Sequence, residues 1–250
     1  MDAEDTQVMT RTGEFTATVS WETPVRGRVA AAVDRLSGPL ADLLERDAND
    51  GDTRMLVADF FSVGLNFSKY QDMTTEYRTS GDSIDYAIML EGKLFAPVEV
   101  RRIGLDLDQR NIQMSRRLAA DQGAEWVILT NGRLWRVYHL RPDGEGGNQP
   151  VEVLDVDLMD ADAYQRNIDA LFHLTRESVD HGRLDALRQW KEAVEAAPLA
   201  GVLREDSVVA AIRDRLLAAT GHQGHIGDAE EIRRSLTDAV VTRGLLPSEE

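Results

Sequence analysis

The sequence predicts an α/β protein with a helical C-terminal region, and three observations lead to this fold class. Between residues 73 and 156, short apolar runs alternate with Gly-containing turns, as strands do. Before residue 64 and again after residue 160, apolar residues recur at helical spacing. One further helical stretch interrupts the strand-like runs. We therefore expect the central order helix, three strands, helix, strand, strand, followed by a helical tail.

The N-terminal third of the chain predicts an arm and two helices. Residues 1–22 are polar and are expected to form an arm or a strand. Thr23-Pro24 then offers a helix N-cap followed by proline at the first helical position, where no amide hydrogen is needed. Gly38-Pro39 is expected to break or kink this helix, because proline removes a backbone donor. After a polar turn, Asp52 can cap a second helix that runs to about Val63.

Strand-like runs dominate the middle of the chain. Three successive strands joined by turns are expected at Met73–Tyr77, Ser83–Leu90 and Leu94–Val100. A helix over about Asp108–Gln122 follows. The next two runs flank Asn131-Gly132, and an Asn-Gly pair between such runs is the strongest short-range hairpin signal. One last strand is expected at Val151–Val156.

The predicted organisation is an N-terminal arm or strand over residues 1–22, an α/β domain over residues 23–158 and a helical region over residues 159–250. In the helical region, Asp228 with Glu231 three positions later is typical of a capping box at the start of a helix. The helices carry apolar faces and little else, which makes them a candidate surface for a protein partner or for homo-oligomers. Light scattering on a chain truncated near Asp160 would test that role, and an unchanged oligomeric state would count against it.

Composition is that of a soluble globular protein, with 42% hydrophobic and 29% charged residues. No run approaches the roughly 18 apolar residues that a membrane helix needs, and the acidic first ten residues lack the features of a signal peptide. The absence of cysteine excludes disulfides, thiolate metal sites and cysteine nucleophiles. We therefore expect a cytoplasmic protein without membrane contacts. The net charge of −16 argues against a protein that grips nucleic acid with its whole surface.

Asp85, Glu99 and Arg101 are the candidate catalytic residues. Side chains alternate along a strand, so Glu99 and Arg101 point to the same face, and Asp85 on the neighbouring strand joins them if the register allows. Two carboxylates beside a cation are the usual arrangement for metal-dependent cleavage of phosphodiesters. Glu99 lies in an otherwise apolar run, where an unpaired carboxylate would be costly to bury. It needs either a metal or a cationic partner, and Arg101 could be that partner without any metal.

The order of elements, with these acids, resembles the PD-(D/E)XK nuclease superfamily and, more closely, the N-terminal nuclease domain of type I restriction-enzyme R subunits and its stand-alone relatives. The resemblance covers roughly residues 49–140 and rests on Asp52-Thr53-Arg54, Thr75-Glu76-Tyr77, Asp85-Tyr86-Ala87-Ile88, Val98-Glu99-Val100, Ile103-Gly104-Leu105, Glu125-Trp126, Leu129-Thr130-Asn131-Gly132 and Trp135-Arg136-Val137-Tyr138. It implies a restriction-endonuclease-like mixed sheet flanked by helices. It also implies that Asp85 and Glu99 bind Mg²⁺, assisted by an acid on the first helix that Asp50 matches loosely.

Two departures from the family pattern concern this same site. Arg101 stands where the family has lysine; arginine stays charged above roughly pH 12, so Arg101 could stabilise a charged transition state but not accept a proton from water. Met114 and Leu118 stand where many active members carry glutamine and tyrosine. Two hypotheses follow. The chain is a Mg²⁺-dependent DNA endonuclease of the restriction or defence type, or it is an inactive pseudonuclease that serves as a nucleic-acid- or protein-binding or assembly module.

The most basic stretch of the chain lies between Glu99 and Arg117 and is a candidate DNA surface. Besides Arg101, the arginines considered for nucleic-acid binding are Arg102, Arg110, Arg116 and Arg117. A solvated helix face is the alternative interpretation. The sequence has no phosphate-binding loop and no helicase motif, so no ATP site is expected in this chain.

His222 and His225 look like a pair of metal ligands in a Gly-rich stretch between two helices. The sequence pattern indicates no third ligand near them, so we interpret them as part of an inter-helix loop.

Overall fold

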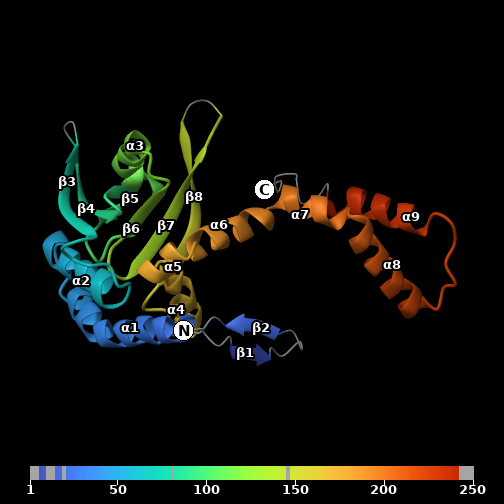
Figure 1. The fold of residues 1–250 in the computed structure, drawn as a ribbon, viewed down its shortest axis with the longest axis horizontal. Coiled ribbons are helices and arrows are strands. Elements are labelled where there is room, and N and C mark those ends of the chain that lie inside the picture. Colours follow the sequence, from blue (N-terminus) through green and yellow to red (C-terminus); the bar gives the residue numbers. More distant parts are fainter. Residues whose placement is uncertain (1–5, 10–14, 19–20, 80–81, 145–146, 242–250) are drawn as a thin grey trace. The chain divides into compact units, whose positions relative to one another are not determined.

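The computed structural model describes residues 6–9, 15–18, 21–79, 82–144 and 147–241 (Figure 1). The chain forms two compact units, one up to Asp185 and one from Ala186 onward. Near the N-terminus, β1 (Thr6–Met9) and β2 (Phe15–Thr18) pair as an antiparallel ribbon.

A six-stranded mixed sheet forms the centre of the first unit, in the order β3-β4-β5-β6-β7-β8. Its strands are β3 (Met73–Thr79), β4 (Asp82–Leu90), β5 (Lys93–Val100), β6 (Trp126–Thr130), β7 (Leu134–Pro142) and β8 (Asn148–Asp157). Neighbouring strands are antiparallel except β5 and β6, which are parallel because a helical crossover returns the chain between them. The predicted α/β class, the three successive strands and the hairpin at Asn131-Gly132 are confirmed.

Two helices precede the sheet, α1 (Glu22–Glu45) and α2 (Asp50–Val63). The break considered at Gly38-Pro39 does not occur: the helix continues through Pro39, and beyond it Leu40 and Leu43 are buried in a small core with Leu56 of α2. Apolar burial after the proline therefore outweighs the lost backbone hydrogen bond. The caps also differ from expectation. Helix α1 begins before Thr23, and α2 is capped by Asn49, whose side chain accepts a hydrogen bond from the amide of Asp52.

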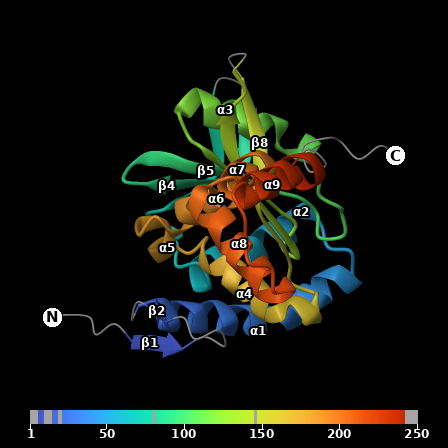
Figure 2. The ribbon, with the colours of Figure 1, turned by 90° about the vertical axis from the view of Figure 1, so that its right-hand side faces the viewer.

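The helix α3 (Gln113–Gln122), entered through the 3₁₀ turn η1 (Gln109–Ile112), makes the crossover between β5 and β6. It contacts both of these strands, and Figure 1 and Figure 2 place it at the end of the first unit opposite α1. Leu118 of α3 packs in one core with Leu129 of β6. Trp135 pairs with Thr130, the neighbour of Leu129, and therefore faces the other side of the sheet. There it packs against Phe60 and Phe61 of α2, with ring centroids 5.0 and 5.4 Å apart.

The first unit is completed by the 3₁₀ turn η2 (Ala161–Ala163), α4 (Tyr164–Phe172) and α5 (Arg176–Asp180). Phe172 is buried, stacks on Trp21, and lies under the guanidinium of Arg26 at 3.8 Å from the ring centroid. These contacts with α1 and its N-cap extend the sheet unit to Asp185, beyond the boundary at 158/159 expected from the sequence.

The second unit is helical in the part that the structure describes. Its helices are α6 (Arg183–Ala193, which begins in the first unit), α7 (Ala196–Leu203), α8 (Asp206–Thr220) and α9 (Asp228–Ser235), followed by a π-helical turn η3 (Leu236–Val241). Helices α8 and α9 contact each other and are joined by residues 221–227 (Figure 2). None of the described helices is long and apolar enough to span a membrane.

Candidate functional site

The sheet brings the two predicted carboxylates together. Strands β4 and β5 pair antiparallel with Tyr86 opposite Val98, so the next position along places Asp85 opposite Glu99 on the same face. The Asp85 side chain extends the pairing, because its Oδ2 accepts a hydrogen bond from the backbone amide of Val100 at 2.8 Å. The register condition that the sequence left open is therefore met.

Glu99 is a buried carboxylate with a donor on each oxygen. Its side chain is 10% exposed; Oε1 lies 2.7 Å from Nη2 of Arg101, and Oε2 accepts a hydrogen bond from the Ser115 hydroxyl at 3.0 Å. Burial raises the pKa of Glu99, the nearby charge of Asp85 raises it further, and Arg101 and Ser115 oppose that shift. Arg101 also donates to the backbone carbonyl of Asn111. The contact between Glu99 and Arg101 is thus an ion pair anchored on both sides.

Asp85 has its own arginine, which comes from α2. Nη1 of Arg54 lies 3.2 Å from Oδ1 of Asp85, and the carbonyl of Arg54 accepts a hydrogen bond from the hydroxyl of Tyr86 at 2.8 Å. Burial raises the pKa of Tyr86, so its phenol remains a donor at neutral pH. Asp50, the loose match for a helix acid, is exposed at the start of α2. A cation one helical turn further along, rather than an acid, contacts Asp85.

The carboxylates of Asp85 and Glu99 do not fit Mg²⁺ in this arrangement. Each of the four carboxylate oxygens has a protein donor: Arg54, the Val100 amide, Arg101 and Ser115. Magnesium requires six oxygens in near-octahedral geometry at about 2.0–2.1 Å, which these donors occlude. Among the described residues, no third histidine or acid joins this pair to make a three-ligand group.

The arginines proposed for nucleic-acid binding are mostly engaged within the protein. Arg102 pairs with Asp47 at 2.9 Å, Arg110 pairs with Asp108 at 2.6 Å, and Arg116 donates to the carbonyl of Asn148. Arg117 is exposed on α3 and makes no ion pair with a residue that the structure describes. The structure therefore distributes these side chains over several partners, and they stay only candidates for DNA contacts.

Asp85 and Glu99 form an acidic pair, and sequence reasoning missed two residues that contact it, Arg54 and Ser115. Ser115 is a fully buried hydroxyl on α3, whose Leu118 is also buried, while Met114 is 38% exposed. A small polar residue on the buried stripe of a helix is a signal that could have indicated a buried polar partner. Arg54 had no comparable signal, because its contact depends on how α2 packs on the sheet.

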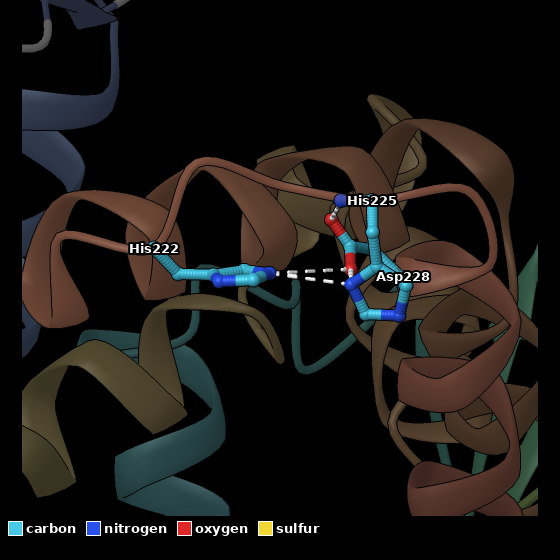
Figure 3. A group of neighbouring side chains, drawn as sticks. All are labelled: His222, His225 and Asp228. Atoms are coloured by element: carbon cyan, nitrogen blue, oxygen red, sulfur yellow. Dashed lines mark hydrogen bonds and ion pairs between the residues drawn. The ribbon is translucent and has the colours of Figure 1, made fainter.

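The second unit contains a further group of candidate metal ligands, which sequence reasoning did not link to one another. His222, His225 and Asp228 place ligand atoms within 4.8 Å of one another (Figure 3). The capping-box role expected for Asp228 is wrong: α9 is capped by Gly227 without a side-chain hydrogen bond, and the Asp228 carboxylate contacts His225 instead. The regular spacing His-x-x-His-x-x-Asp was the signal that could have linked the three residues.

Comparisons with known proteins add no relative: no family model, no curated protein and no solved structure matches the chain. The role of the C-terminal helices as a partner surface stays a prediction. Side chains that would serve it are exposed, among them Trp190 at 66% and Leu216 at 49%.

Proposed function

We propose that the sheet unit is a nuclease-like module that has lost Mg²⁺-dependent cleavage and serves in binding or assembly. One observation carries the proposal: each carboxylate of the acidic pair is neutralised by an arginine, Asp85 by Arg54 and Glu99 by Arg101. Arginine supplies the positive charge that a metal would otherwise supply, so the acids stay compatible with a folded sheet in the absence of metal.

The order of elements supports the nuclease-like part of the proposal. Helix α2 is followed by three antiparallel strands, then by the crossover helix α3 and by β6 parallel to β5. The resemblance to the PD-(D/E)XK superfamily implies a mixed sheet flanked by helices for residues 49–140, and this element order is compatible with it. The finer assignment to the R-subunit family rests on the sequence segments alone.

The chemistry of Arg101 supports the loss of cleavage. A guanidinium does not release its proton at neutral pH, so it cannot act as the base that activates water. Its Nη2 is also committed to both Glu99 and the Asn111 carbonyl. The whole chain has a net charge of −16, and most arginines near the acidic pair are engaged within the protein. A protein partner therefore fits this module better than nucleic acid.

A cleavage assay tests the proposal. We expect the purified chain with Mg²⁺ or Mn²⁺ to leave linear, circular and single-stranded DNA intact, and Asp85→Ala to behave identically. Arg101→Lys asks whether the arginine is what blocks cutting, and Arg102→Lys is the matched control, because Arg102 pairs with Asp47 outside the acidic pair. Cutting by the unaltered chain that Asp85→Ala abolishes would overturn the proposal in favour of an active Mg²⁺-dependent endonuclease.

A further inference from the structure

We propose that His222, His225 and Asp228 form a binding site for a divalent transition-metal ion, with Zn²⁺ as the ion that the ligand set suits best. The group lies entirely within the second unit, between the end of α8 and the start of α9. It is therefore independent of the proposed function of the sheet unit.

The distances within the group lie on both sides of those expected between the ligand atoms of a metal site. Nε2 of His222 lies 3.2 Å from Nδ1 of His225 and 3.9 Å from Oδ1 of Asp228, and Nδ1 of His225 lies 2.5 Å from that same oxygen (Figure 3). Ligand atoms of a tetrahedral site with bonds of about 2.0–2.1 Å are about 3.3 Å apart. The three distances bracket this value, so small side-chain rotations would accommodate the ion.

The carboxylate of Asp228 is oriented so that Oδ1 contacts the two candidate histidine ligands, while other donors hold Oδ2. Oδ2 accepts hydrogen bonds from the backbone amide of His225 at 2.9 Å and from Nε of Arg213 at 3.3 Å. Oδ1 points toward the two imidazoles. These donors to Oδ2 are the kind of outer-shell contacts that fix a metal-binding carboxylate.

Glycine at position 224 allows the loop to bring these residues together. Gly224 has φ +78°, and a Cβ there would lie 3.1 Å from Nη2 of Arg213 and 3.3 Å from Oδ2 of Asp228. A larger residue would be strained in this conformation and would press on the outer-shell contact. The side chains of His222 and His225 are 52% and 56% exposed, so an ion can reach them from solvent.

The ligand set favours a transition metal over Mg²⁺ or Ca²⁺. Imidazole nitrogens suit Zn²⁺, Cu²⁺ and Ni²⁺, whereas Mg²⁺ and Ca²⁺ prefer oxygen ligands. Three protein ligands leave a fourth position of Zn²⁺ for water or for an external ligand. A pocket of about 510 Å³ borders the same residues and is lined by apolar side chains of α8 and α9, including Ile212, Leu216 and Ile232. An external ligand at the fourth position would have room there.

Metal titration of the full chain, without a histidine tag and after treatment with a chelator, tests the site. We expect one Zn²⁺ per chain by calorimetry, and with Co²⁺ the visible absorption of a four-coordinate ion. Loss of an outer-shell contact commonly weakens metal binding about 10- to 100-fold, so His222→Asn and His225→Asn, each losing a ligand, should weaken it by at least about tenfold. His181→Asn is the control, because His181 is an exposed histidine in the first unit.

One result would contradict the proposed metal site. It is Zn²⁺ binding by the unaltered chain that equals binding by the His222→Asn/His225→Asn double variant. Circular dichroism checks that the variants fold. Should one unfold, His222→Asn alone decides, because the side chain of His222 is 52% exposed and its polar contacts among the described residues are with His225 and Asp228.

Discussion

The two groups of candidate metal ligands in this molecule differ in what already contacts them. In the sheet, Asp85 and Glu99 lie opposite each other, and every carboxylate oxygen has a donor from the protein. In the loop between α8 and α9, Oδ2 of Asp228 is held by protein donors while Oδ1 and two imidazole nitrogens converge on one another. Residue type alone would favour the sheet as the metal site, but the contacts favour the loop.

The charge partner of an acid therefore determines whether the acid can serve as a metal ligand. A buried carboxylate must be compensated, and an arginine that does so permanently leaves no vacancy for an ion. Glu99 is compensated by Arg101 inside the sheet unit. Arg213 contacts Oδ2 of Asp228, whereas Oδ1 faces the imidazoles of His222 and His225, which can themselves bind a metal ion.

Arg101→Ala is expected to have the largest effect on stability. It tests whether Arg101 and Glu99 form an ion pair that stabilises the fold, in contrast to the His222, His225 and Asp228 group. Removing the guanidinium leaves Glu99 buried with Ser115 as its side-chain donor, so we expect a loss of about 2 to 3 kcal/mol in the free energy of unfolding. Urea denaturation measures the change. His222→Ala, which removes a half-exposed ring from the loop group, should leave the unfolding midpoint unchanged in the absence of metal.

An unchanged free energy of unfolding in Arg101→Ala would contradict this contrast between the two groups. Arg110→Ala serves as the matched control for loss of an arginine, because Arg110 pairs with Asp108 at the surface and a surface pair contributes little. Equal effects of Arg101→Ala and Arg110→Ala would mean that the ion pair on Glu99 does not compensate a buried charge.

A smaller effect is expected in the pH dependence of stability. Burial raises the pKa of Glu99 above its ordinary value of 4.5, so the folded chain binds a proton there more readily than the unfolded chain. Between the raised pKa and about 4.5, stability from this group therefore increases as pH falls. Compared with Glu99→Gln, the unaltered chain should gain relative stability as the pH is lowered from neutral toward about 4.5.

Asp157 provides the opposite sign in the same sheet unit. Two hydrogen bonds from Arg133 lower the pKa of Asp157, so its contribution is present above its ordinary value of 3.8 and is lost as the pH falls through the lowered pKa. The difference in unfolding free energy between the unaltered chain and Asp157→Asn should thus shrink only at acidic pH. A pH-independent difference for Glu99→Gln would contradict the raised pKa of Glu99.

Much of the sheet could be predicted because the residue pattern that indicates a strand is local. The runs at Ser83–Leu90 and Leu94–Val100 differ from β4 and β5 by one residue at their starts, and the alternation within them predicts that Asp85 and Glu99 share a face. Trp126 and Trp135, in the two runs that flank Asn131-Gly132, are both buried. These outcomes depend on period-two patterns and on turn residues that act over a few positions.

The charge partners could not be predicted in the same way. The contact of Arg54 with Asp85 spans α2 and β4, so it depends on packing that no local pattern encodes. The Asp228–Glu231 spacing fits a capping box, but the loop conformation at Gly227, with φ +107°, directs the Asp228 carboxylate back to His225. The continuity of α1 through Pro39 could not be predicted for a similar reason, because the burial of Leu40 and Leu43 depends on α2.

Mn²⁺ binding tests most directly whether the acidic pair of the sheet is closed to metal. The chain carrying His222→Asn and His225→Asn, which removes the loop ligands, is titrated with Mn²⁺ while the signal of the free ion is followed by electron paramagnetic resonance. We predict that all added Mn²⁺ stays free, and that Asp85→Ala in the same background changes nothing. Retention of one Mn²⁺ per chain that Asp85→Ala abolishes would contradict the account.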